Sequence, residues 1–292
     1  MWQSCHLQLH AHQGAFRDNP QATTLYPQDG NSLAAWFNAT TSDRATRISA
    51  YLQTNWGKFG SSSPEWGDNI GTFPGSMEVW AHMAAGQTQR SLDLIRLQWG
   101  YMLSKNESTQ STFWEGYNKD GSFAYQGIYM SNSHGWAAGP GGALTYHVAG
   151  IRPVTAGGLQ WRVAPQIGDL TSTDGSLTFP GGRSVRVVWQ SAGWADAVSP
   201  TPAKDASFSM MVDSRTNTGS IGFVGLPLPA GLTASDVVVT ADGRPLWEKG
   251  ALHSSVGRGL RAEVLGTHLV FSPWPASLSN FTITRQQMTL DV

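Results

Sequence analysis

Residues 139–153, GPGGALTYHVAGIRP, separate two parts of the sequence that differ in texture. The first half of this stretch is an apolar run that follows a Gly-Pro break, and it predicts a helix at 141–148. After the second half, short segments of alternating apolar and polar residues take over. The sequence therefore predicts helices in residues 1–152 and strands in residues 153–292.

Upstream of this stretch, apolar residues recur at helical spacing. The longest pattern runs through residues 88–104, where Leu92, Ile95 and Trp99 share one face. Shorter helical patterns, each preceded by residues that helix starts prefer, cover residues 32–39, 43–54 and 75–85. Successive helices joined by long polar loops predict paired helical hairpins and not a parallel α/β sheet.

Downstream, apolar residues alternate with polar ones, as in half-buried strands. These patterns cover residues 185–189, 208–212, 221–223, 237–239, 269–271 and 281–283. The predicted turns between strands are Asp174-Gly175, Gly181-Gly182 and Asp242-Gly243. We therefore expect an antiparallel β-sandwich of roughly eight strands in residues 153–292, and an α+β multidomain fold for the whole chain.

Charge and composition exclude several classes of protein. The 292 residues carry 19 Lys and Arg against 20 Asp and Glu, and no apolar run approaches the roughly 18 residues of a membrane helix. Scattered single charges argue against a nucleic-acid surface, which needs clustered Lys and Arg. A single cysteine, Cys5, cannot form an internal disulfide or a thiolate zinc site. We expect no membrane partner, no nucleic acid, no cofactor and no metal. The first residues of the sequence contain Cys5, His6, His10 and His12, which are a weak candidate for a metal site.

The aromatic content favours carbohydrate as a ligand. Only 13% of the residues are charged, whereas the chain has 13 Trp, 7 Tyr, 11 Phe and 33 Gly. Aromatic planes stack on the apolar faces of sugar rings, and Asn, Gln and Asp bind the hydroxyl groups. The alternative, that the tryptophans fill the core, stays equally open at this point.

Two residues carry the strongest chemical signal. Glu115 lies between Trp114 and Gly116 just after the 88–104 helix, where partial burial of its carboxylate would suit a general base; it could also be a hydrogen-bond acceptor at a helix end. His134 could bond a sugar hydroxyl or fix a loop. Four other carboxylates in glycine-rich and aromatic surroundings are better explained as helix caps or hydroxyl ligands than as a catalytic acid: Asp29, Glu65, Asp68 and Glu78.

Four motifs occur here in the order and spacing found in the fungal α-L-rhamnosidase family, a branch of the six-hairpin glycosidases. The motifs are YPQDGN at 26–31, TFWEGY at 112–117, SHGW at 133–136 followed by Gly139-Pro140, and AGIRP at 149–153. The chain resembles this family over about residues 13–190, and the resemblance weakens through the C-terminal strands.

The resemblance implies an (α/α)₆ barrel followed by a β-sandwich. It also implies an inverting glycosidase that releases terminal α-linked L-rhamnose from glycans or glycosides outside the cell. Inversion requires one carboxylic acid and one carboxylate that activates water. Glu115 matches the family's general base and His134 matches a sugar-hydroxyl ligand, and we expect Trp114, Trp136 and Asp29, which lie in the matching motifs, to bind substrate.

The chain also departs from the family. The family's general acid and most of its sugar-binding residues lie upstream of the segment that matches 14–17 here. We therefore expect residues 1–152 to represent only the later hairpins of the barrel, the chain to be a fragment that has lost any signal peptide, and its activity in isolation to be open. Two other functions are possible: a lyase that cleaves rhamnosyl-uronate linkages to an unsaturated product, and a non-catalytic carbohydrate-binding fragment.

Overall fold

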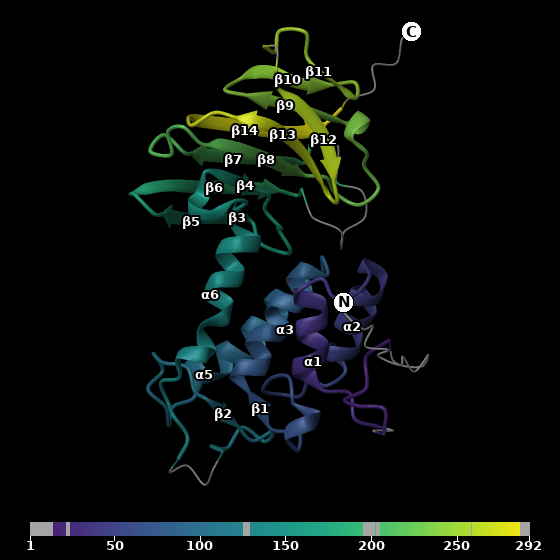
Figure 1. The fold of residues 1–292 in the computed structure, drawn as a ribbon, viewed down its shortest axis with the longest axis vertical. Helices are drawn as coiled ribbons and strands as arrows, with labels where there is room; N and C mark the ends of the chain where they lie inside the picture. Colours follow the sequence, from purple (N-terminus) through teal and green to yellow (C-terminus); the bar gives the residue numbers. More distant parts are fainter. Residues whose placement is uncertain are drawn as a thin grey trace, which may run out of the picture. The chain divides into compact units, whose positions relative to one another are not determined.

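The computed structural model describes residues 14–21, 24–124, 129–194, 202, 205–257 and 259–286. The chain divides into two compact units, Met1–Ala143 and Leu144–Val292. The first unit is built mainly from helices and the second mainly from strands (Figure 1), so the α+β class is confirmed. None of the described helices is long and apolar enough to cross a membrane.

Helix α3 is the centre of the first unit and packs against α1, α2, α4 and α6. The helices are α1 (Gln28–Trp36), α2 (Ser42–Gln53), α3 (Thr72–Ala84), α4 (Thr88–Leu94), α5 (Gly100–Ser104) and α6 (Gly139–Ala143). A π-helical segment, η2 (Ile95–Trp99), joins α4 to α5, and another, η5 (Leu144–Val148), follows α6. The helices predicted in this part of the sequence are confirmed, although their ends are shifted. Consecutive helices pack against each other in two hairpins, α1 with α2 and α3 with α4.

The amphipathic pattern of residues 88–104 explains how this unit is filled. Leu92 and Trp99 are buried, while Arg96 on the other face is exposed. Trp99 and Leu94 join a cluster of buried aromatic and aliphatic side chains around Trp114, and a second cluster forms around Ile48 and Leu52 of α2. Burial of these faces stabilises the hairpins, since short helices are marginal by themselves.

The second unit contains a seven-stranded and a five-stranded sheet. The larger sheet has the order β11-β10-β9-β14-β7-β6-β5 and the smaller one β12-β13-β8-β4-β3. The two sheets meet through aromatic rings, such as Trp247 and Phe271, whose centroids are 6.3 Å apart. The strands are β3 (Ile151–Pro153), β4 (Gln160–Val163), β5 (Ser172–Phe179), β6 (Arg183–Ala192), β7 (Ser207–Asp213), β8 (Ile221–Pro227), β9 (Val237–Ala241), β10 (Arg244–Glu248), β11 (Ala251–Leu252), β12 (Arg261–Leu265), β13 (His268–Trp274) and β14 (Leu278–Arg285).

Most predicted strands and turns are confirmed in this unit, but Asp174-Gly175 is not a turn. Both residues lie within β5, and Gly175 pairs with Val187 of β6. A Cβ on Gly175 would lie 2.7 Å from the Cβ of Ala149, so the glycine permits close packing inside a strand. The sheets also hold more strands than the roughly eight expected, and β4 and β8 form a parallel pair.

Helix α6 approaches α3 very closely at Gly139. A Cβ at this position would lie 2.3 Å from the Cβ of Ser76, and the Trp80 indole donates a hydrogen bond to the Gly139 carbonyl at 3.0 Å. A side chain at residue 139 therefore has no room unless the two helices separate.

We predict opposite effects for two glycine substitutions in α6. Gly139→Ala should lower the free energy of unfolding by about 1–3 kcal/mol because it overpacks the contact with α3. Gly141→Ala is the matched control: a Cβ there meets no atom within 4 Å, so its higher helix propensity should stabilise the protein by up to about 1 kcal/mol. Urea unfolding followed by tryptophan fluorescence measures both, and equal effects of the two variants would contradict the close contact.

Candidate active site at the start of helix α3

Glu115 is fixed beside the N-terminus of α3 by a short sheet. The strands β1 (Ile70–Gly71) and β2 (Gly116–Tyr117) pair antiparallel, with Gly71 opposite Gly116. The backbone N–H of Thr72, the first residue of α3, donates to the Glu115 carbonyl at 3.1 Å. A Cβ on Gly116 would lie 2.9 Å from the Ile70 carbonyl oxygen, so this pairing requires glycine.

A second backbone segment brings His134 next to Glu115. The N–H of Glu115 donates to the Ser131 carbonyl at 2.9 Å, and the N–H of His134 donates to the Phe113 carbonyl at 2.8 Å. Ser131 also donates its N–H to Oε2 of Glu115 at 3.2 Å, which fixes the carboxylate. Both side chains are half-buried. The structure therefore places these two predicted site residues on adjacent strands of backbone.

An exposed aromatic surface adjoins His134. The Trp136 side chain is 63% exposed, and its ring centroid lies 4.6 Å from that of Phe73 and 5.3 Å from that of His134. Ser76 of α3 donates to the Trp136 carbonyl at 3.1 Å, which anchors the segment that carries the tryptophan. Phe73 was not among the residues predicted from the sequence; its signal there is an aromatic residue directly before the Pro74-Gly75 pair at a helix start. Such a surface suits the apolar face of a sugar ring.

Trp114 is buried and does not share this surface. Its ring makes edge-to-face contacts with Tyr117 and Phe123 at 5.4 and 5.1 Å in the core. Neighbouring residues on extended backbone project to opposite sides, so the chain that presents Glu115 turns Trp114 inward. The expectation that Trp114 binds substrate does not agree with this position.

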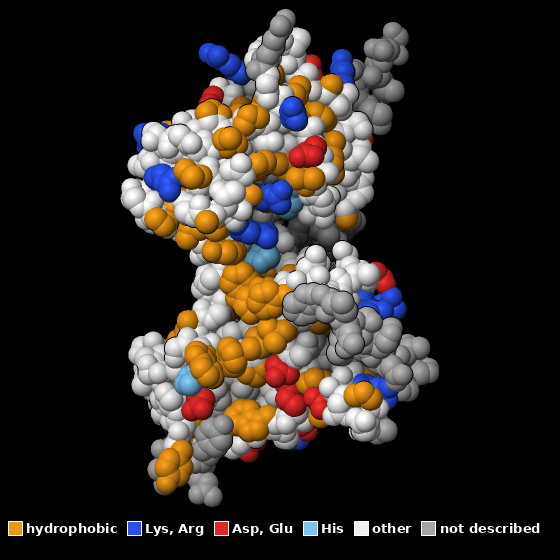
Figure 2. All heavy atoms as spheres, in the orientation of Figure 1, with side chains coloured by type: hydrophobic (Ala, Val, Ile, Leu, Met, Phe, Trp, Pro, Cys, Tyr) orange, Lys and Arg blue, Asp and Glu red, His pale blue; other side chains and the backbone are white. Residues whose placement is uncertain are grey.

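Asp29 lies in the first turn of α1 and is exposed. Its carboxylate accepts the N–H of Gly30 at 2.5 Å. Glu65 accepts the N–H groups of Gln28 and Asp29 at 2.9 and 3.1 Å and thereby caps α1, as expected. Acidic side chains gather on one face of this unit (Figure 2). No hydrogen bond or ring contact between described residues joins Asp29 to Glu115.

Glu78 forms a polar centre inside the same unit. Its side chain is fully buried, and Oε2 accepts hydrogen bonds from Gln28 Nε2 and Ser61 Oγ, both at 2.6 Å. Its Oε1 accepts from Trp56 Nε1 at 2.6 Å and lies 3.1 Å from Nε2 of His82. Glu78 thus binds an internal serine hydroxyl and N–H groups of the same unit. Because its lone pairs are taken, Glu78 is not available as a catalytic acid.

His82 extends this network towards α2 and α4. Burial lowers the pKa of His82, so the ring is neutral at pH 7 and its Nε2–H donates to Glu78. Nδ1 then accepts from the Ser49 hydroxyl at 2.6 Å, and Ser49 accepts from Nη1 of Arg90 at 2.7 Å. The hydrogen bonds all run in one direction, from the Arg90 guanidinium to the Glu78 carboxylate.

Within the described part of the chain, no three His, Cys, Asp or Glu side chains gather as metal ligands. The weak metal candidate, Cys5 with His6, His10 and His12, lies outside the described residues.

Comparison with known proteins identifies the fold. No protein-family model and no curated protein matches the chain. Among solved structures it is similar to the α-L-rhamnosidase of Dictyoglumus thermophilum, with a TM-score of 0.63 and 17% identity over 93% of this chain and 26% of that one. It is also similar to the Streptomyces avermitilis α-L-rhamnosidase complexed with L-rhamnose (TM-score 0.59, 20% identity, 87% and 21% coverage). For the Aspergillus terreus α-L-rhamnosidase the TM-score is 0.52, with 17% identity and 70% and 22% coverage.

These comparisons support a rhamnosidase fold and do not single out the fungal branch. The chain spans only about a quarter of the length of these neighbours. At such identities the likeness concerns the fold alone.

We predict that Glu78→Gln strongly destabilises the protein. The amide nitrogen of the new side chain carries two donor hydrogens, and they would face groups that are themselves donors. A buried polar group that loses its partner lowers the free energy of unfolding by about 3 kcal/mol or more. Urea unfolding at pH 7 measures the loss. Glu107→Gln is the control: Glu107 is exposed and forms a surface ion pair with Lys105, so its loss should have a much smaller effect. Similar small losses in both variants would contradict the role of Glu78.

The neutral state of His82 predicts a pH dependence of stability. Its folded-state pKa is lower than the ordinary value of 6.5, so the unfolded chain binds a proton below pH 6.5 that the folded chain does not. The contribution of His82 to the free energy of unfolding should therefore be fully present above pH 6.5 and decrease as the pH is lowered. In His82→Gln this dependence should be shallower by up to about 1.4 kcal/mol per pH unit. Unfolding at pH 7, 6 and 5 measures the slopes, and parallel curves would exclude a neutral buried His82.

Proposed function

We propose that the chain is part of a glycoside hydrolase that releases α-linked L-rhamnose with inversion, and that Glu115 is its general base. The observation that carries the proposal is the position of Glu115. Its half-buried carboxylate is held by the Ser131 N–H, and its backbone pairs with the segment of His134, whose ring lies 5.3 Å from the exposed ring of Trp136. The solved neighbours are α-L-rhamnosidases, one of them complexed with L-rhamnose, and this supports rhamnose as the sugar.

The arrangement fits the chemistry of a water-activating base. Only one carboxylate oxygen of Glu115 accepts the Ser131 hydrogen bond, which leaves the other able to take a proton from water. His134 would donate to or accept from a sugar hydroxyl and thus orient the ring, while Trp136 and Phe73 would cover its apolar face.

The second carboxyl group of an inverting pair is not evident among the groups around Glu115. Glu78 is saturated by donors and Glu65 caps a helix. We propose that residues 1–152 form the later hairpins of an (α/α)₆ barrel, with residues 153–292 as its β-sandwich domain. The general acid would then come from hairpins equivalent to the large part of the neighbours that this chain does not cover. Asp29 stays a proposed substrate contact because of its place in the 26–31 motif.

Glu115→Gln should abolish most activity in an enzyme that carries the complete barrel. Loss of a general base costs about 10²- to 10⁴-fold in rate, whereas the sugar contacts stay in place, so kcat should fall and KM should hardly change. The measurement is hydrolysis of an aryl α-L-rhamnoside, with azide added to a Glu115→Ala variant because azide can attack the sugar without a general base.

Glu107→Gln, an exposed glutamate of the same unit, is the activity control and should match the parent enzyme. A Glu115→Gln enzyme that keeps more than about a tenth of its kcat would exclude the general base. An unsaturated uronate formed from a rhamnosyl-uronate oligosaccharide, with no hydrolysis of the aryl α-L-rhamnoside, would exclude the hydrolase.

A further inference from the structure

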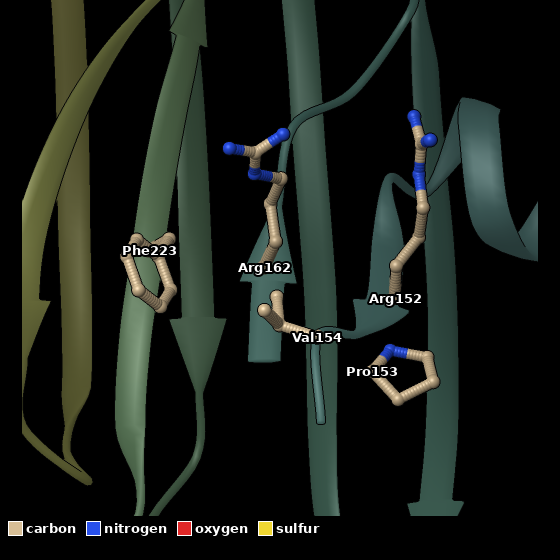
Figure 3. A pocket seen from close by; sticks show the side chains of 5 residues that line it. All are labelled: Arg152, Pro153, Val154, Arg162 and Phe223. Atoms are coloured by element: carbon tan, nitrogen blue, oxygen red, sulfur yellow. The ribbon is translucent and has the colours of Figure 1, made fainter. Parts of the chain in front are cut away.

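Three side chains form a row on the five-stranded sheet of the second unit. Arg152 of β3 is the register partner of Arg162 on β4, and Arg162 is the register partner of Phe223 on β8. Partners on neighbouring strands project to the same face of a sheet. Figure 3 shows the two arginines extending in the same direction, with the Phe223 ring on the far side of Arg162 from Arg152.

This row places two positive charges opposite each other, which weakens a strand pair. The pKa of Arg152 is lowered, first by burial and then by the charge of Arg162. Among the described residues, no carboxylate forms an ion pair with either arginine. The Nε of Arg162 is buried and has no hydrogen-bond partner in that part of the chain. A buried donor of this kind costs stability until an acceptor reaches it.

The rest of the surroundings adds no compensating charge. Arg152 is held in place by a hydrogen bond from Nε to the Tyr146 carbonyl at 2.9 Å, and one of its terminal nitrogens lies 3.5 Å from Nδ1 of His147. Burial is the main cause of low pKa values of about 3 for His147 and about 4 for His268, and the arginine charges contribute to both. Both rings are therefore neutral at pH 7, and the local charge comes from the two guanidinium groups.

The arginines line a hollow of about 250 Å³ with Pro153, Val154 and Phe223. One side of the hollow is cationic and the other is apolar, with Val154 49% exposed. The volume is smaller than the roughly 300–1,000 Å³ of pockets that enclose drug-sized ligands, so it suits a compact ligand such as one sugar unit.

We propose that this hollow binds an acidic sugar, with a carboxylate or sulfate group on Arg152 and Arg162 and the ring against Phe223. Guanidinium groups bind oxyanions through paired hydrogen bonds, and the anion would remove the repulsion between the two strands. The aromatic ring adds contact with the apolar face of the sugar. The site consists of residues of the second unit alone. The proposal is therefore independent of the proposed hydrolase function, and either can fail without the other.

Calorimetric titration of the full chain with sodium D-glucuronate, sodium sulfate and D-glucose tests the proposal. Glucuronate should bind, with an affinity that falls as NaCl is added, and glucose should give no measurable binding. Arg162→Gln should weaken glucuronate binding at least about tenfold, because it removes a charge-assisted hydrogen bond. The same variant should raise the Tm in buffer without added oxyanions, since it removes repulsion and breaks no side-chain hydrogen bond to another described residue.

Two further variants separate the parts of the site. Phe223→Ala should weaken glucuronate binding and leave sulfate binding unchanged. Arg261→Gln is the matched control, an exposed arginine on β12 of the same sheet, and should alter neither. The proposal is overturned if glucuronate gives no heat, if Arg162→Gln binds it as well as the parent, or if glucose binds equally. Binding of sulfate without glucuronate would leave a simple anion site and refute the acidic sugar.

Discussion

The buried carboxylate of Glu78 is the constraint on which the helical unit depends. A charge inside a protein persists only where hydrogen bonds replace water. Its donors come from different segments: Gln28 on α1, Trp56 and Ser61 in the loop after α2, and His82 on α3 itself. These segments cannot shift independently without leaving a donor or the carboxylate unpaired. The network therefore fixes α3 relative to its neighbours more specifically than apolar packing would.

The candidate site uses the rigidity of α3. The first residue of that helix binds the backbone of Glu115, and Ser76 one turn later binds the backbone of Trp136. Two loops that the sequence separates by some twenty residues thus meet at one helix end, and their backbone pairing sets His134 beside Glu115. Positioning of this kind comes from the scaffold and not from the reactive groups, which explains how an irregular loop can hold a precise geometry.

The second unit follows a different principle. Its inward-facing residues, such as Trp161 and Val163 of β4, are buried and apolar, and the indole N–H of Trp161 is satisfied by the Ser220 hydroxyl at 2.8 Å. The outward residues of β3 and β4 include Arg152 and Arg162, which are register partners. Among the described residues, no carboxylate forms an ion pair with either arginine. A sheet tolerates this unfavourable pair because its core is strong, and the uncompensated charge remains available for a ligand.

The sequence by itself determined the order of helices and strands, because the periods of 3.6 and 2 are local properties that each segment shows independently. It also selected Glu115 and His134, whose motifs are short and contiguous. The tertiary structure alone decided that Trp114 is core, that Phe73 joins Trp136 on the surface and that Gly175 lies within a strand. It alone joined Glu78 to Gln28, fifty residues away, and set Arg152 against Arg162. These outcomes depend on which distant segments meet, and no local pattern encodes that.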